Sequence, residues 1–286
     1  MCHRGFRKPP ARRRIEKAMS THPKAVHWRE YLIEAGAIGA FMMSAATFAA
    51  ILYHPLSPVF MAIHGELLRR SLMGLAMGLT AVSIIYSPWG QRSGAHMNPA
   101  VTLTFFRLGK VAPPDLIGYV AAQFSGAAAG MAIATLLLGG IVSHPSVNYV
   151  TTLPGSSGNA IAFIAEGAIS FVLMLTVLTV SNQPRLARFT GVCAGLLVWT
   201  YITFEAPLSG MSMNPARTLG SALAARDFPG LWIYFTAPPL GMLTAAELFT
   251  RRYGLERIAC AKLHHPAPGP CIFGCRNTQA PLARTA

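Results

Sequence analysis

The sequence predicts an all-α membrane protein with six transmembrane helices, two re-entrant half-helices and an inverted internal repeat. Three observations support this fold class. Only 12% of the 286 residues are charged and 52% are hydrophobic, whereas soluble domains carry about 25% charged residues. Six segments each contain the roughly 20 mostly apolar residues that a bilayer-spanning helix needs. A short motif also occurs twice, 116 positions apart.

The apolar segments define the predicted helices in chain order. The transmembrane helices are expected at 30–52, 68–87, 116–140, 160–181, 189–207 and 231–250. Two shorter apolar runs lie at 98–108 and 214–225. A helix rises only ~1.5 Å per residue, so these runs are too short to cross the bilayer. We therefore expect two half-length helices.

The net charge of +14 comes mostly from the two ends of the chain. Of the 24 Lys and Arg residues, nine lie in residues 1–29 and six in residues 251–286. Nucleic-acid binding would need a basic face on a folded module, so we predict contact with anionic lipid and no nucleic-acid partner. We interpret both ends as disordered cytoplasmic tails around one membrane domain at 30–250.

The same charge distribution predicts the orientation. An even number of spans places both termini on one side, and the positive-inside rule assigns that side to the cytoplasm. The predicted location is therefore a multi-pass protein of the plasma or inner membrane.

The cysteines predict neither a disulfide framework nor a metal site. Cys271 and Cys275 follow His264 and His265, which is a combination of metal-binding residue types. Their spacing matches no standard zinc pattern. We predict no metal and no cofactor.

The internal repeat divides the membrane domain into residues 30–140 and 160–250. SGAHMNPAVTL (93–103) resembles SGMSMNPARTL (209–219), and Glu34 in the first span has a counterpart in Glu166 in the fourth. Each repeat contains three spans. Because three is odd, the second repeat must enter the membrane from the opposite side, which makes the repeats inverted. The two half-helices should then meet near the middle of the bilayer.

Each half-helix is predicted to begin at an Asn-Pro-Ala box, Asn98-Pro99-Ala100 or Asn214-Pro215-Ala216. Asn is a preferred N-cap and Pro is favoured at the first helical position. Two helix N-termini that face each other create a positive field. An Asn amide adds a neutral hydrogen-bond donor, whereas Asp would add an anion. This combination favours water or an uncharged solute and opposes protons and cations.

With two such boxes, each preceded by Ser-Gly and followed by Thr-Leu, the sequence resembles the aquaporin (major intrinsic protein) family over roughly residues 30–250. The resemblance implies six tilted helices, two re-entrant half-helices and a homotetramer with one pore per subunit. It also implies a passive channel for water or small neutral solutes that has no catalytic activity.

The repeats differ directly after the boxes, where Val101 corresponds to Arg217. An arginine inside a membrane domain is costly and normally functional, so it predicts a selectivity filter on the outer side. A structural ion pair or a snorkelling side chain is the alternative. The resemblance implies that the other filter walls are Met211, Ile202 and a residue of the second span, either Met77 or Gly78.

Three further residues receive roles from the resemblance. His96 matches a histidine of the inner pore mouth, although packing of the loop explains it equally well. Glu34 and Glu166 match buried carboxylates behind the re-entrant loops. We expect them to accept backbone N–H groups from loop residues, because such groups must be satisfied inside a membrane.

The filter departs from two patterns of the family. Water-specific members have an aromatic filter residue on the second span and a His filter residue on the fifth, and this chain has neither at the corresponding positions, which are Met77 or Gly78 and Ile202. Glycerol-conducting members usually carry Asp after the filter Arg, and this chain has Thr218. The pattern looks more like bacterial or plant-like members with a non-standard filter. A facilitator mainly for glycerol, urea, ammonia, peroxide or metalloid acids remains an alternative to a water channel.

Two other classes of protein were weighed. Secondary transporters share inverted repeats and broken helices but need a polar or charged site for the coupling ion at the midplane. The membrane domain offers two Asn residues there, which makes an ion-coupled transporter the weaker alternative. HExxH and GxSxG motifs are absent, so no enzyme class is supported.

Overall fold

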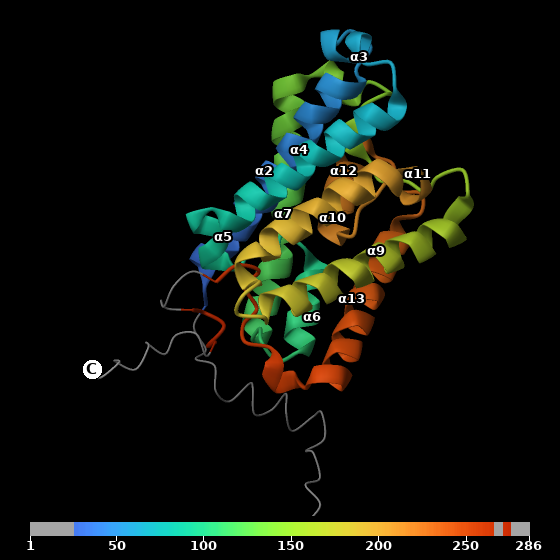
Figure 1. The fold of residues 1–286 in the computed structure, drawn as a ribbon. Coiled ribbons are helices and arrows are strands. Elements are labelled where there is room, and N and C mark those ends of the chain that lie inside the picture. The colour runs from blue at the N-terminus through green and yellow to red at the C-terminus, as the bar shows by residue number, and fades with distance from the viewer. Residues whose placement is uncertain (1–25, 266–270, 276–286) are drawn as a thin grey trace, which may run out of the picture.

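The computed structural model describes residues 26–265 and 271–275, and every regular element in that part of the chain is a helix (Figure 1). The prediction of an all-α protein is therefore confirmed. The elements in chain order are α2 (Trp28–Tyr53), α3 (Pro58–Ala62), α4 (Glu66–Tyr86), α5 (Pro88–Ser93), α6 (Pro99–Arg107), α7 (Pro113–Leu138), α8 (Gly140–Ser143), η1 (Asn148–Val150), α9 (Gly158–Ser181), η2 (Ala187–Phe189), α10 (Thr190–Phe204), α11 (Ala206–Ser209), α12 (Pro215–Ala225), α13 (Leu231–Tyr253) and η3 (Leu255–Arg257).

Five described helical stretches are long and apolar enough to cross a membrane. They are α2, α4, α7, α9 and the run Ala187–Phe204, which includes α10. The sixth predicted span is α13, which has 23 residues but carries two internal prolines, and Arg251 and Arg252 lie in its last turn. It packs along the length of α9, so it completes the bundle despite its more polar end.

The packing of the long helices reflects the inverted repeat. α2 packs on α7 in the first repeat and α9 packs on α13 in the second, while α4 and α10 meet between the repeats. Glycines allow these close approaches. A Cβ on Gly130 would clash with the Gly39 carbonyl, and one on Gly241 would clash with the Gly167 carbonyl. Small residues are the usual means of helix packing in membranes, where lipid is as apolar as the side chains.

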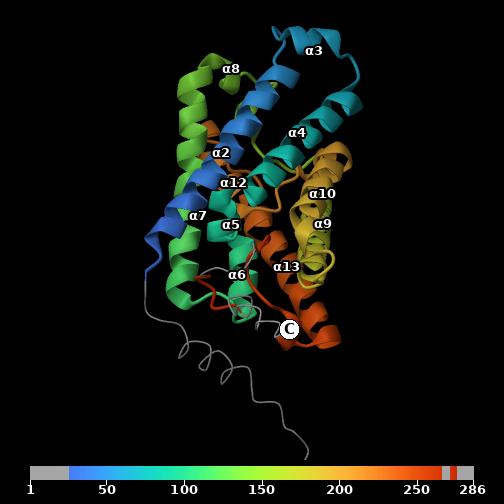
Figure 2. The ribbon, with the colours of Figure 1, turned by 60° about the vertical axis from the view of Figure 1, so that its left-hand side comes forward.

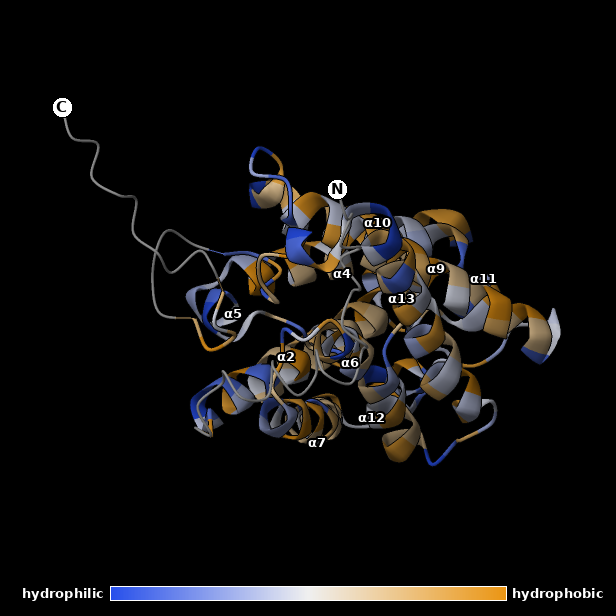
Figure 3. Ribbon diagram, turned by 90° about the horizontal axis from the view of Figure 1, so that it is seen from below, coloured by the Kyte–Doolittle hydropathy of each residue, from blue (hydrophilic) through white to orange (hydrophobic). Residues whose placement is uncertain are grey.

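The two half-helices, α6 and α12, lie inside the bundle (Figure 2). α12 of the second repeat packs mainly on α7 of the first, and α6 of the first repeat contacts α13 of the second. The half-helices therefore connect the two repeats. Large apolar side chains such as Leu136, Ile164 and Leu248 are exposed on the outside of the bundle, and Figure 3 shows apolar residues around its outer faces.

The first turn of α2 and the last turn of α13 lie at the same end of the bundle, which we call the inner end (Figures 1 and 2). Of the predicted C-terminal tail, residues 251–253 complete α13. Residues 258–265 and 271–275, here called the C-terminal strap, pack against the bundle and bury Ile258, Ala261 and Phe273. Residues 1–25 of the predicted N-terminal tail lie outside the described residues, as do 266–270 and 276–286.

Candidate functional site

Each half-helix begins at the Asn of its Asn-Pro-Ala box, and the Asn side chain caps it. Asn98 Oδ1 accepts a hydrogen bond from Ala100 N at 2.8 Å. Asn214 Oδ1 accepts from Ala216 N at 3.0 Å and from Arg217 N at 3.3 Å. Proline is the first residue of both helices, because its missing N–H would have no partner there.

The same two side chains join the two loops across the centre of the bundle. Asn98 Nδ2 donates to the Met213 carbonyl oxygen and Asn214 Nδ2 donates to the Met97 carbonyl oxygen, each at 2.7 Å. These bonds are reciprocal, as expected for inverted repeats. An amide nitrogen carries two N–H donors, so each asparagine keeps a second donor beyond this bond.

The loop before each half-helix has an unusual backbone. Ala95, Met97, Met211 and Met213 have φ angles between 49° and 55°. Non-glycine residues rarely adopt this region, and it persists only where the surroundings enforce it. The surroundings here are two buried carboxylates that accept the N–H groups of these loops.

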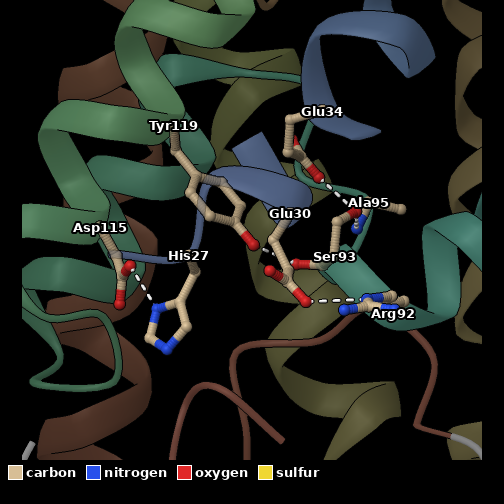
Figure 4. A network of polar contacts seen from close by, with 8 residues as sticks. All are labelled: His27, Glu30, Glu34, Arg92, Ser93, Ala95, Asp115 and Tyr119. Atoms are coloured by element: carbon tan, nitrogen blue, oxygen red, sulfur yellow. Dashed lines mark hydrogen bonds and ion pairs between the residues drawn. The ribbon is translucent and has the colours of Figure 1, made fainter. Parts of the chain in front are cut away.

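Glu34 holds the first loop (Figure 4). Its Oε1 accepts from His96 N at 3.0 Å and from Ser93 Oγ at 2.8 Å. Its Oε2 accepts from Met97 N at 2.6 Å and from Gln123 Nε2 at 2.9 Å. The side chain is fully buried. The four donors therefore take the place of water around the carboxylate.

Glu166 holds the second loop in the same way. Its Oε1 accepts from Ser212 N at 2.7 Å and from Ser209 Oγ at 2.8 Å. Its Oε2 accepts from Met213 N at 2.7 Å. Each of the two carboxylates therefore satisfies two backbone N–H groups that have no helical partner.

A pair of buried tyrosines, not singled out from the sequence, completes both supports. Tyr119 donates to the Ser93 carbonyl oxygen at 2.6 Å, as Figure 4 shows, and Tyr234 donates to the Ser209 carbonyl oxygen at 2.5 Å. The signal was present in the repeat, because the two tyrosines occupy matching places 115 positions apart. Figure 4 also shows the ion pair of Arg92 with Glu30, at 2.8 Å, beside this support.

A cavity of about 410 Å³ runs past both asparagines. Most predicted filter residues line it. They are Arg217, Met211, Ile202 and Met77. Gly78 instead faces α10, where a Cβ would lie 2.5 Å from the Gly195 carbonyl oxygen. Between the two residues left open on the second span, Met77 is therefore the one on the cavity.

Arg217 brings a positive charge to this cavity. Its Nη1 is buried and has no hydrogen-bond partner among the described residues. The neighbouring Thr218 is buried. Its Oγ1 lies 2.8 Å from Thr152 Oγ1. Thr218 therefore joins the loop before α9 to α12.

His96 lines the inner part of the cavity but its ring is engaged within the protein. Nε2 donates to the Ala261 carbonyl oxygen at 2.8 Å, and Nδ1 lies 3.1 Å from Thr102 Oγ1. The ring stacks between Phe105 and Phe273. The packing role is thus the one that these contacts favour.

Comparisons with known proteins agree with this arrangement. Residues 21–249 match the family model described as major intrinsic protein. The chain is 37% identical to aquaporin NIP1-3 of Oryza sativa subsp. japonica over 60% of its length and 58% of the relative's. It is 34% identical to aquaporin NIP3-1 of Arabidopsis thaliana over 77% of its length and 65% of the relative's. The chain thus spans about three fifths of the length of these relatives.

A solved structure shares the fold. The X-ray structure of the aquaglyceroporin from Plasmodium falciparum superposes with a TM-score of 0.65 and 22% sequence identity, over 77% of this chain and 94% of that one. Paired half-helices capped by asparagine, two buried carboxylates behind them and a family match over most of the length lead to one conclusion. The chain is a multi-pass membrane protein of the major intrinsic protein (aquaporin) family.

Proposed function

We propose that this protein is a passive channel for water and small uncharged solutes. The observation that carries the proposal is the cavity that runs past both half-helix N-termini, with Asn98 and Asn214 on its wall. Each asparagine offers a neutral donor where two positive helix ends meet. A water molecule or hydroxyl group gains hydrogen bonds there, whereas a cation meets only positive potential.

Arg217 is proposed to act as the charged wall of the selectivity filter. An arginine whose buried Nη1 has no hydrogen-bond partner within the described part of the chain is available to a passing solute oxygen. Its charge also raises the barrier to protons and metal ions. The absence of a carboxylate within 4.0 Å of it among the described residues argues against the structural ion pair considered from the sequence.

The remaining filter walls favour a range of solutes wider than water. Met77, Ile202 and Met211 are apolar, so the only strong hydrogen-bonding wall is Arg217. An apolar side opposite a polar one suits molecules with a hydrocarbon edge and hydroxyl or amide groups. Glycerol fits this description, and urea, ammonia, peroxide and metalloid acids, which are small neutral hydrogen-bonding molecules, are the other candidate solutes.

Orientation and assembly are part of the proposal. The inner end, which holds the start of α2 and the end of α13, is proposed to face the cytoplasm of the plasma or inner membrane, because basic tails continue from it. Family membership supports a homotetramer with one pore per subunit. An ion-coupled transporter is disfavoured, since the one carboxylate among the described residues that line the cavity is Glu66, which is 73% exposed and pairs with Arg70.

The channel proposal makes a direct prediction for transport. Proteoliposomes containing the protein should shrink rapidly under an osmotic gradient, with a low activation energy, because water would move through a preformed path. Stopped-flow light scattering measures this rate. The rate should be unchanged when Na⁺ and proton gradients are removed, and flux that required either gradient would contradict a passive channel.

A second prediction concerns the filter. The same vesicles should admit glycerol, urea and peroxide. Three walls of the proposed filter, Met77, Ile202 and Met211, are apolar, and Arg217 is its polar wall, so the filter should not select for water alone. Ile202→His replaces an apolar side chain with a polar one that reaches further into the cavity, so it should lower glycerol flux severalfold relative to water flux. Ile202→Leu, which keeps size and polarity, serves as the matched control. Exclusion of all three solutes by the unmodified protein would refute the broad filter.

A further inference from the structure

A cluster of metal-ligating side chains lies in the C-terminal strap, at the inner end of the bundle. It consists of Cys260, His265, Cys271 and Cys275, and we call it the thiol–imidazole cluster. One ligand atom from each residue lies within 4.8 Å of all the others. The strap follows the family match, which ends at residue 249, so the cluster is a feature of this chain beyond the shared membrane domain.

The distances in the cluster are close to those of a four-coordinate site. A tetrahedron with Zn–S bonds of about 2.3 Å has edges of about 3.8 Å. Cys260 Sγ and Cys271 Sγ lie 3.6 Å apart, and His265 Nε2 lies 3.0 Å from Cys275 Sγ. A small outward movement of these atoms would admit an ion at the centre.

The chemistry of the four groups selects the kind of ion. Three thiolates and one imidazole form a soft, closed set that is used in structural zinc sites. Hard ions such as Mg²⁺ and Ca²⁺ prefer oxygen ligands. The backbone N–H of Lys262 donates to Cys260 Sγ at 3.5 Å, which is the kind of outer contact that orients a ligand.

The fold, rather than the spacing, brings these groups together. The spacing of His264, His265, Cys271 and Cys275 matches no standard zinc pattern, and the sequence therefore predicted no metal site. In the structure the ring of His264 packs against Tyr86, with centroids 4.8 Å apart, while His265 joins the cluster. The fourth ligand, Cys260, lies further back along the strap.

The strap carrying this cluster lies against the inner end of the cavity. Leu263 lines the cavity itself, and its N–H donates to the Gly94 carbonyl oxygen at 3.2 Å. Ala259 N donates to Asn182 Oδ1 at 2.8 Å, in the loop after α9. The strap thus connects the loops of both repeats, but such a short irregular segment has little core of its own.

We propose that the thiol–imidazole cluster binds one Zn²⁺ ion and that the ion holds the C-terminal strap against the inner end of the cavity. A metal that closes a loop of this kind supplies the stability that a small segment lacks. A disulfide between Cys260 and Cys271 is the competing use of these thiols. Both are free thiols in the structure, and the proposed cytoplasmic location would keep them reduced.

The test is metal binding to the full-length protein in detergent. Cys2→Ser and Cys193→Ser together remove the thiols outside the cluster and provide the background. After chelation under reducing conditions, Co²⁺ should bind at one ion per chain with sulfur-to-cobalt charge-transfer absorption, and Zn²⁺ should displace it. Adding Cys271→Ser and Cys275→Ser should lower the affinity for Co²⁺ by at least about tenfold. Loss of a group that only hydrogen-bonds to a metal ligand already lowers metal affinity by about that factor.

A second measurement tests whether the ion holds the strap. Lys262 is only 6% exposed, so trypsin should cut there slowly with Zn²⁺ bound and rapidly after chelation. The four-serine protein should be cut rapidly in both conditions. Absence of stoichiometric binding, a Cys260–Cys271 disulfide in the protein purified under reducing conditions, or equal cutting with and without Zn²⁺ would each overturn the proposal. These readouts do not depend on what the cavity conducts.

Discussion

Glu166→Leu is expected to destabilise the fold strongly. The substitution removes the acceptor of two backbone N–H groups, those of Ser212 and Met213, and of the Ser209 hydroxyl. A buried polar group left without a partner costs about 1–3 kcal/mol. The Ser209 hydroxyl keeps Glu205 Oε1 as an acceptor, so two groups lose their partner. Together they remove about 2–6 kcal/mol, which compares with a whole native stability of about 5–15 kcal/mol.

The measurement is the thermal unfolding midpoint and the yield of monodisperse protein in detergent. Glu166→Gln keeps one carbonyl oxygen and should lose less. Glu247→Leu is the matched control, because Glu247 is an exposed glutamate on α13 whose ion pairs lie at the surface. A Glu166→Leu protein as stable as the Glu247→Leu protein would mean that the loop holds its conformation without the carboxylate.

Arg217→Val is expected to make the channel leak charge. At 4 Å and an effective dielectric constant of about 20, a unit charge repels a cation by about 4 kcal/mol. Each 1.36 kcal/mol corresponds to about tenfold, so proton or cation conductance should rise by about one to three orders of magnitude. Valine is also the residue at the matching place in the first repeat, Val101, so the α12 backbone should accept it.

Proteoliposomes with an internal pH dye and an imposed potassium diffusion potential measure this leak. Arg107→Val is the control, because Arg107 ends α6 with its side chain 55% exposed and pairs loosely with Glu247. The control should leave the leak unchanged. Equal ion exclusion by Arg217→Val and unmodified protein would assign Arg217 a structural role in place of a filter role.

The fold class could be predicted from the sequence because each feature that defines it lies within a short segment or recurs along the chain. Apolar length predicted the long helices, and the two Asn-Pro-Ala boxes predicted where α6 and α12 begin. The odd number of spans per repeat predicted the inversion, which the packing of α2 on α7 and of α9 on α13 reflects. These features depend on local composition and on repetition, and both are visible without coordinates.

Other features depended on rotation and on distant contacts. Met77 and Gly78 are adjacent on one helix, and only the packing of Gly78 on α10 decides which of them faces the cavity. The sequence left two roles open for His96, lining the cavity or packing the loop. The contacts of its ring with Phe273 and with the Ala261 carbonyl oxygen favour packing. The short helix α5 lies between α4 and the first Asn-Pro-Ala box. Counting residues back from Asn98 therefore did not settle which residue of α4 is the filter residue.

By itself, the sequence determined the class, the repeats, the capped half-helices and the arginine that follows only the second box. Each of these follows from residue type and local order. The tertiary structure decided the filter residue on α4, the tyrosine supports and the assembly of Cys260 with His265, Cys271 and Cys275. The physical reason is that a side chain's direction and its distant neighbours are set by how helices pack and by where a chain end folds back, and neither is encoded in local spacing.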